Sequence, residues 1–246
     1  MKLGIQVSSL KPLLLTASQV DTACEKMKAL GVDTVQLQWI DKSVAISDIA
    51  ASLKKHGIKS VSVQDFYELV AEDFGYYVNL NAATGGTWLC VSRIPEHLKS
   101  REGLDVFVQQ LKEMEAKLPA GQKLCLHPVT SDFRAVEGMD AVAYILDAWP
   151  ELDICFDLYH LYRCCDDMPS YIRRYADRIC MVHFKDGIGD KLVPAGQGDT
   201  RWDGVVQACL DAGVPYGFAE QEKWEDDPYD CLKQAMDWIQ TQIENC

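Results

Sequence analysis

Short apolar runs recur along the chain at fairly even spacing, and longer segments of mixed polarity separate them. Each run has five or six residues and the composition of a buried β-strand. Their near-continuous apolar character is typical of strands that are buried on both faces, as in parallel sheets. The runs occupy residues 3–7, 33–37, 59–63, 87–92, 123–127, 152–157, 179–183 and 216–220.

The segments between these runs carry apolar residues three or four positions apart, which is typical of helices with one buried face. Three of the helical segments end at a glycine that is followed by Val or Ile and then by a strand: Gly31, Gly57 and Gly213. Glycine just past a helix end readily adopts the left-handed conformation that closes the last turn. The apolar face is formed by Val20, Cys24, Met27 and Leu30 in 17–30 and by Val106, Leu111, Met114 and Leu118 in 105–118.

The alternation of strand and helix predicts the fold class. Eight strands start about 26 to 37 residues apart, each followed by a helical segment or a loop. This pattern predicts an α/β protein, a (β/α)8 TIM barrel that forms a single domain over residues 1–246. An open, doubly wound sheet is the alternative, and the count of eight strands argues against it.

Composition and charge narrow the classes of partner. The chain has 246 residues, 48% of them hydrophobic, and a formal net charge of -13 from 37 acidic and 24 basic residues. Such an acidic surface repels phosphate backbones and anionic lipids, so we expect neither nucleic-acid nor membrane partners. The segment PLLLTA at 12–17 could be taken for part of a signal peptide, but polar residues interrupt the apolar stretch before it. We expect a first strand and a loop there instead.

The ten cysteines show no regular spacing. Cys164 and Cys165 are adjacent, and no second pair matches them at metal-binding spacing. We therefore expect neither a disulfide framework nor a structural zinc site, and the chain suits a reducing cytoplasm. Free thiols that behave as small hydrophobic side chains are expected inside the strands, at Cys90, Cys125, Cys155 and Cys180.

Four consecutive predicted strands, the fifth to the eighth, end in His127, Asp157, His183 and Glu220. In a TIM barrel these ends meet at one face, so the four side chains can converge there. Two imidazoles and two carboxylates suit a single divalent ion such as Mn, Co, Zn or Mg. Any one of these residues alone is more often a helix cap or a hydrogen-bonded loop anchor, and it is the joint pattern that favours a metal site.

The first four strands end in residues of a different kind. These polar residues could hydrogen-bond the hydroxyl groups of a polyol, or they could be ordinary loop residues. They are Gln6, Gln36 or Gln38, Gln64 with Asp65, and Arg93.

Several motifs together give the chain a resemblance to a known family. FDLYH (156–160) resembles an Asp-x-x-His motif after strand six, and VHFKD (182–186) a His-x-Lys-Asp motif after strand seven. AGQGDTRW (195–202) is similar to a Gly-Glu-Gly-Asp loop that ends at Trp, and FAEQE (218–222) to a last strand that ends at Glu. In this order they resemble the sugar phosphate isomerase/epimerase proteins, which are xylose-isomerase-like barrels.

The resemblance implies one divalent metal ion with Asp157, His183 and Glu220 as ligands. It also implies that Glu220 acts as the proton-transfer base and that His160 and Lys185 contact the substrate. The fourth ligand of the family is usually a Glu at the end of strand five, where this chain has His127. Trp202, at the end of the glycine-rich loop, is a further candidate for covering the substrate.

The expected activity is isomerisation or epimerisation of a small sugar or keto-sugar through an enediolate, which the metal would stabilise. Two alternatives stay open: elimination from a 3-keto-glycoside or an inosose, and a non-catalytic barrel subunit. Assembly into a homo-oligomer also stays open. The related apurinic-site endonucleases need further histidines on strands two and three, where this chain has DTVQL and KSVSV, so we exclude that activity.

Overall fold

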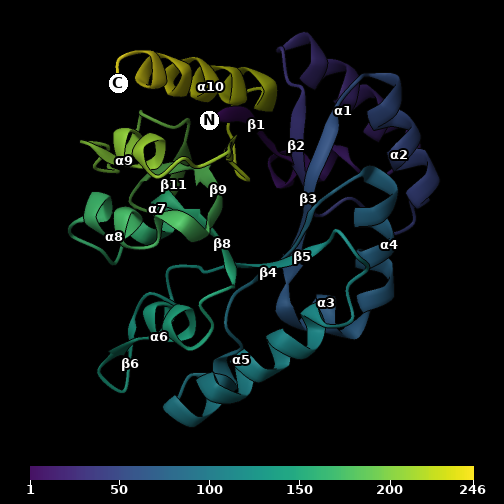
Figure 1. The fold of residues 1–246 in the computed structure, drawn as a ribbon. Coiled ribbons are helices and arrows are strands. Elements are labelled where there is room, and N and C mark those ends of the chain that lie inside the picture. Colours follow the sequence, from purple (N-terminus) through teal and green to yellow (C-terminus); the bar gives the residue numbers. More distant parts are fainter.

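A computed structural model describes residues 1–246 and contains a closed barrel of eight parallel strands. The strand order around the barrel is β1-β12-β9-β8-β5-β4-β3-β2, and helices surround it (Figure 1). The predicted TIM barrel is confirmed, and each predicted strand lies within three residues of an observed one. The barrel strands are β1 (Lys2–Gln6), β2 (Thr34–Leu37), β3 (Lys59–Phe66), β4 (Trp88–Ser92), β5 (Lys123–His127), β8 (Asp153–Asp157), β9 (Ile179–Phe184) and β12 (Tyr216–Ala219).

Ten α-helices and three short 3₁₀ helices connect the strands. The barrel closes where β1 pairs with β12, and the last helix, α10, packs against both strands (Figure 1). Two small hairpins, β6 (Ala135–Val136) with β7 (Met139–Asp140) and β10 (Asp186–Ile188) with β11 (Lys191–Val193), lie outside the barrel. The helices are α1 (Ala17–Ala29), α2 (Ile46–Lys55), α3 (Tyr67–Glu72), α4 (Phe74–Thr84), α5 (Arg101–Glu115), α6 (Ala141–Ala148), α7 (Leu158–Tyr162), α8 (Met168–Arg174), α9 (Val205–Asp211), α10 (Pro228–Glu244), η1 (Val7–Leu13), η2 (Glu96–Leu98) and η3 (Ala176–Arg178).

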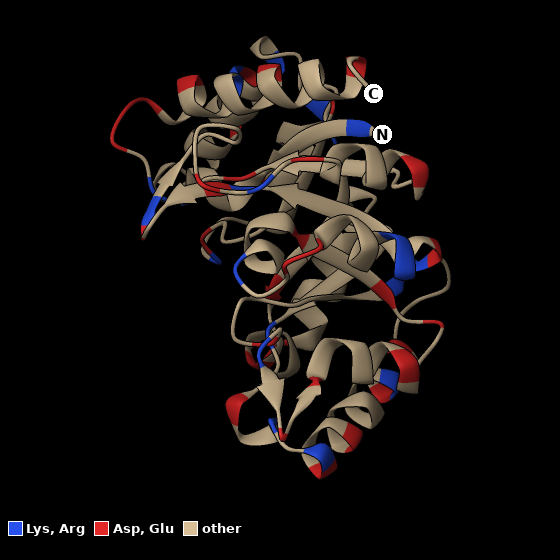
Figure 2. Cartoon of the chain, turned by 90° about the vertical axis from the view of Figure 1, so that its left-hand side faces the viewer, with Lys and Arg blue, Asp and Glu red and all other residues tan.

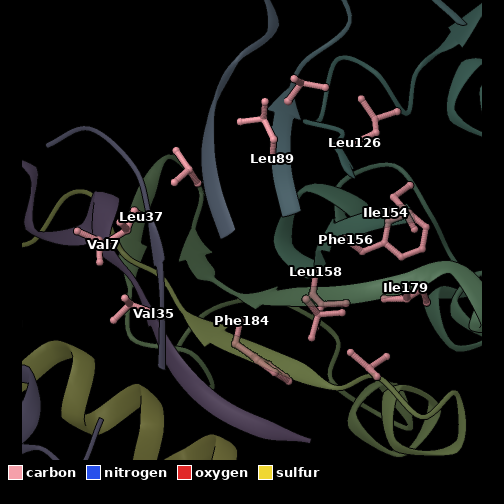
Figure 3. Close-up of a cluster of buried hydrophobic side chains, with 14 of the residues drawn as sticks. Val7, Val35, Leu37, Leu89, Leu126, Ile154, Phe156, Leu158, Ile179 and Phe184 are labelled. Atoms are coloured by element: carbon pink, nitrogen blue, oxygen red, sulfur yellow. The ribbon is translucent and has the colours of Figure 1, made fainter. Parts of the chain in front are cut away.

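Alternate residues of each strand point to opposite sides of the barrel wall. In β5, Leu124 and Leu126 belong to the large core of 61 buried residues between strands and helices, part of which Figure 3 shows. Cys125 belongs to a separate cluster of seven buried residues inside the barrel. Because His127 is two residues beyond Cys125, its side chain also points inward, at the upper end of the barrel.

The predicted buried face of α5 was wrong at Val106. That side chain is 47% exposed, because the buried face runs through Leu104, Phe107, Val108, Leu111 and Met114. Residues three and four positions apart on this face place Val106 on the solvent side of the helix. Leu118 lies beyond the end of α5, where it is only partly buried.

The three glycines predicted to end helices do so. Gly31, Gly57 and Gly213 have φ angles of 82°, 65° and 67°, in the left-handed region. None of the helices combines the length and the apolar character that a membrane crossing requires. Acidic residues are spread over helices and loops with fewer basic residues among them, in agreement with the net charge of -13 (Figure 2).

Candidate metal and proton-transfer site

Asp157 ends β8 and has two separate roles in the structure. Its Oδ1 accepts the backbone N–H of His160 at 2.9 Å and thereby caps helix α7. Its Oδ2 is buried and has no hydrogen-bond partner. Burying a carboxylate oxygen without a partner costs free energy. Oδ1 is therefore accounted for by the helix cap, whereas Oδ2 indicates a position where a ligand such as a metal ion would bind.

His183 and Glu220 lie next to this oxygen. His183 Nδ1 is 2.7 Å from Glu220 Oε2. This contact is an ion pair without hydrogen-bond geometry, so Glu220 Oε2 also lacks a hydrogen-bond partner. Ligand atoms of Asp157, His183 and Glu220 all lie within 4.8 Å of one another, and the three side chains are at most 4% exposed. The structure therefore brings together three of the four predicted metal ligands.

His127, the fourth predicted ligand, lies beside this group rather than within it. Its Nε2 is 3.1 Å from His183 Nδ1, and its Nδ1 is 3.0 Å from the hydroxyl of Ser92. Burial, together with the neighbouring His183, holds the pKa of His127 well below its usual range. The imidazole is therefore neutral at physiological pH, which is the form that binds a metal.

A buried lysine lies between two carboxylates at the same end of the barrel. Lys185 Nζ is 2.6 Å from Glu222 Oε1 and 3.7 Å from Glu220 Oε1. Burial opposes the lysine's charge, but the carboxylates of Glu220 and Glu222 outweigh it and raise the pKa of Lys185. Burial likewise opposes the Glu220 carboxylate, yet Lys185 and His183 keep the pKa of Glu220 well below its usual range.

Glu222 was not predicted from the sequence. Burial and the neighbouring Glu220 raise the pKa of its carboxyl to about 7, so it can hold or release a proton near neutral pH. The signal was present in FAEQE, because residues two apart at a strand end point to the same side. Its side chain is 20% exposed, which places it at the rim of the site.

The predicted glutamines of the first three strands form a hydrogen-bonded chain. Gln6 donates to Gln36 at 2.9 Å, Gln36 donates to Gln64 at 3.1 Å, and Gln64 donates to Gln38 at 3.2 Å. All four are buried. Gln36 Oε1 also contacts His183 Nε2, so the chain reaches the metal-ligand group. Of the two candidates on the second strand, Gln36 is the one that contacts it.

His160 is also close to the group, since its Nε2 is 3.7 Å from Asp157 Oδ2. Its Nδ1 lies 2.7 Å from the Thr130 hydroxyl, and 21% of the side chain is exposed. Burial lowers the pKa of His160. The ring is therefore neutral and accessible from the open end of the barrel.

Arg93 and Trp202 make their contacts elsewhere. Arg93 pairs with Glu68 at 3.4 Å, and its guanidinium stacks on Phe66. Trp202 stacks on Phe184 and donates its indole N–H to Asp186 at 3.0 Å. In this structure both side chains therefore act in packing rather than contacting the metal-ligand group.

Asp186 organises the loop that ends at Trp202. Its two carboxylate oxygens accept five N–H groups at 2.9 to 3.1 Å, four of them from the backbone. A buried carboxylate with this many donors holds the loop against the barrel. The donors belong to Gly187, Gly196, Gly198, Thr200 and Trp202.

The donor set fits a divalent metal ion. Two carboxylate oxygens without hydrogen bonds and one imidazole nitrogen form a mixed N/O set, and a neutral imidazole lies beside them. Without an ion, burial disfavours a charged His183, but Glu220 outweighs this and raises the pKa of the imidazole. A bound cation would replace that proton and satisfy Asp157 Oδ2 and Glu220 Oε2, the two oxygens without hydrogen bonds.

A family model described as a xylose isomerase-like TIM barrel matches residues 24–242. No curated protein sequence matches the chain. Among solved structures, a sugar phosphate isomerase/epimerase from Parabacteroides distasonis ATCC 8503 is similar, with 16% identity, a TM-score of 0.78 and 96% of each chain covered.

Two further solved structures are similar at the same level. The IOLI protein with a bound zinc atom has 16% identity and a TM-score of 0.75, with 99% of this chain and 98% of that chain covered. D-allulose 3-epimerase from Methylomonas sp. in complex with D-allulose has 16% identity and a TM-score of 0.76, with 98% of this chain and 96% of that chain covered. At such identities the likeness concerns the fold.

Proposed function

Since the chain belongs to the xylose isomerase-like TIM barrel family, we propose that it is a divalent-metal-dependent isomerase or epimerase of a small sugar or keto-sugar. The proposed metal ligands are Asp157, His183 and Glu220, with His127 beside them. The observation that carries the proposal is the pair of buried carboxylate oxygens without hydrogen bonds, within ligand distance of an imidazole.

The metal, one of Mn, Co, Zn or Mg, would polarise the substrate carbonyl as a Lewis acid. Glu220 would act as the base. Its low pKa keeps it a carboxylate, which can remove a proton from the carbon next to the carbonyl. Lys185, which is charged and 3.7 Å from Glu220 Oε1, would stabilise the developing oxyanion.

His160 and the glutamines serve substrate binding in this proposal. His160 is partly exposed and neutral, so one ring nitrogen can accept or donate a hydrogen bond to a hydroxyl group. Gln6, Gln36, Gln38 and Gln64 hold one another in place. Their hydrogen-bonded chain contacts the metal-ligand group through Gln36 Oε1 and His183 Nε2.

The replacement of a family Glu by His127 bears on which reaction is favoured. A metal-bound imidazole has no free lone pair and cannot take up a proton. Two carboxylates remain among the proposed ligands, and we assign the base to Glu220 because Asp157 uses one oxygen to cap α7. We therefore propose one-sided proton transfer, which favours isomerisation over symmetric epimerisation.

We also place this activity in a reducing compartment, the cytoplasm. The support is the sequence, in which ten cysteines lack any framework spacing.

Metal binding tests the proposal most simply. Calorimetric titration of the metal-free chain with Mn²⁺, Co²⁺, Zn²⁺ and Mg²⁺ should give about one ion per chain for at least one of them. Product analysis with unphosphorylated aldoses and ketoses should then show interconversion that stops on chelation. A chain that binds none of the four ions would contradict the proposal and favour a non-catalytic barrel. Loss of water or of a leaving group instead of interconversion would assign the elimination reaction.

A further inference from the structure

Sulfur atoms form a layer inside the barrel, directly below the carboxylate group. Four neighbouring strands, β4, β5, β8 and β9, each contribute one cysteine to the interior cluster, and Met181 adds a fifth sulfur. The four cysteines are at most 5% exposed. Two of their sulfurs, of Cys125 and Cys180, are 3.3 Å apart. The interior of a TIM barrel is usually filled by Val, Ile and Leu, which cannot bind a metal. Here cysteines occupy these positions, and their sulfur atoms can bind one.

The layer reaches the histidines through Cys155. Its Sγ lies 3.2 Å from His183 Nε2, while His183 Nδ1 lies 3.1 Å from His127 Nε2. Ligand atoms of His127, Cys155 and His183 all lie within 4.8 Å of one another, and all three side chains are buried. His183 therefore has one nitrogen facing the carboxylates and the other facing the sulfur layer.

The two donor sets differ in chemistry. The carboxylate set suits hard or borderline ions, whereas two imidazoles and a thiolate suit zinc-class and softer ions and disfavour Mg²⁺ and Mn²⁺. The Cys155 side chain is fully buried and lies 3.2 Å from His183 Nε2. A bound cation stabilises the thiolate, and the displaced proton leaves to water as the S–H bond is replaced by a sulfur–metal bond.

We propose that His127, Cys155 and His183 form a second metal site, one residue layer below the carboxylate group, which binds a thiophilic divalent ion such as Zn²⁺ or Co²⁺. The ion exchanges the contact between His183 Nε2 and Gln36 Oε1 for a coordination bond. Gln36 Oε1 keeps its hydrogen bond from Gln6. The site shares His127 and His183 with the proposed sugar-metal centre but not Asp157 or Glu220, so a sulfur signal tests it separately from the sugar chemistry.

Cobalt spectroscopy on the full chain distinguishes the two donor sets, because only a thiolate ligand gives an intense sulfur-to-cobalt charge-transfer band in the near ultraviolet. Metal-free protein, kept reduced and anaerobic, is titrated with Co²⁺ alone. The parent chain should develop the band to saturation. Cys155→Ser should lose it and bind Co²⁺ in this site at least about tenfold more weakly.

Two matched variants complete the design. Asp157→Asn should keep the band, since it alters only the carboxylate set. Cys209→Ser should also keep it, because Cys209 is equally buried but lies in α9, outside the interior cluster. Cys155→Ala replaces the serine variant if far-UV circular dichroism shows that the latter does not fold.

Each outcome decides between the two proposals. Cobalt binding without a charge-transfer band, weakened by Asp157→Asn, overturns the thiol site and leaves the proposed function standing. A band that persists in Cys155→Ser overturns the assignment of Cys155 as the ligand. A band lost only in Cys155→Ser supports the site, even where no sugar interconversion is found.

Discussion

At the scale of single residues, Asp157 separates the two roles that a carboxylate at a strand end can have. Its Oδ1 caps α7 and its Oδ2 lacks a partner. We predict that Asp157→Asn and Asp157→Ala both lose metal affinity by tenfold or more. Only the alanine variant should also lose about 1 kcal/mol of stability, because asparagine can still cap the helix. Calorimetric metal titration and urea unfolding of the metal-free variants measure the two effects separately. Equal stability of both variants would contradict the capping role.

Glu222 gives the metal-free protein a specific pH dependence. Its pKa is raised from 4.5 to about 7 on folding, so the folded state binds a proton that the unfolded state releases between these values. The stabilisation is therefore full below pH 4.5 and is lost as the pH rises through 7. We predict that Glu222→Gln removes about 3 kcal/mol of this pH dependence. Urea unfolding at a series of pH values checks it, with the exposed Glu225→Gln as the control. An unchanged slope would show that Glu222 titrates normally.

The sequence predicts the metal-ligand group because each of its residues ends a strand of the same barrel, and parallel strands end at one face. It could not predict that His127 lies beside the other three rather than among them, since that depends on side-chain rotamers. It also could not predict the direction in which the Arg93 side chain points. Arg93 has a φ of 69°, a left-handed conformation that local residue preferences disfavour, and its side chain leads away to Glu68.

At the scale of elements, the loop from Pro194 to Trp202 depends on Asp186, whose carboxylate accepts five N–H groups. We predict that Asp186→Asn lowers the free energy of unfolding by about 3 kcal/mol, because an amide keeps one acceptor oxygen and loses the charge. Hydrogen exchange of the loop amides should rise at the same time. Asp199→Asn, in the same loop but exposed, is the control and should change neither quantity.

Helix and strand positions follow from hydrophobic spacing because burial imposes one period on each element type. This worked for every barrel strand and for the glycines that end α1, α2 and α9. It failed at Val106, where an apolar residue faces solvent and nothing in the local spacing marks it as exposed. The ordered loop around Asp186 could not be predicted either, because backbone N–H groups of residues up to 14 positions away hold it in place.

At the scale of the whole molecule, the barrel protects most of the cysteines. Seven of the ten are buried, Cys164 and Cys246 are exposed, and Cys165 is intermediate. We predict that a thiol reagent modifies two or three cysteines rapidly in the folded protein and the other seven only on unfolding. Replacement of Cys164 and Cys165 by Ser should leave Cys246 as the rapidly modified thiol and leave metal binding unchanged. Loss of metal from that double variant would show that these thiols matter for the site.

Solvent exchange measures directly whether Glu220 transfers a proton on one face of a metal-bound sugar. In heavy water, with a keto-sugar substrate and the preferred ion, we predict deuterium at the carbon next to the carbonyl on one face only. Exchange should stop on chelation and fall by more than ~10²-fold in Glu220→Gln, because the variant loses the base and weakens the metal. His127→Glu should keep the metal and add exchange on the second face. Comparable exchange on both faces in the parent chain, or undiminished exchange in Glu220→Gln, would show that Glu220 is not the single base.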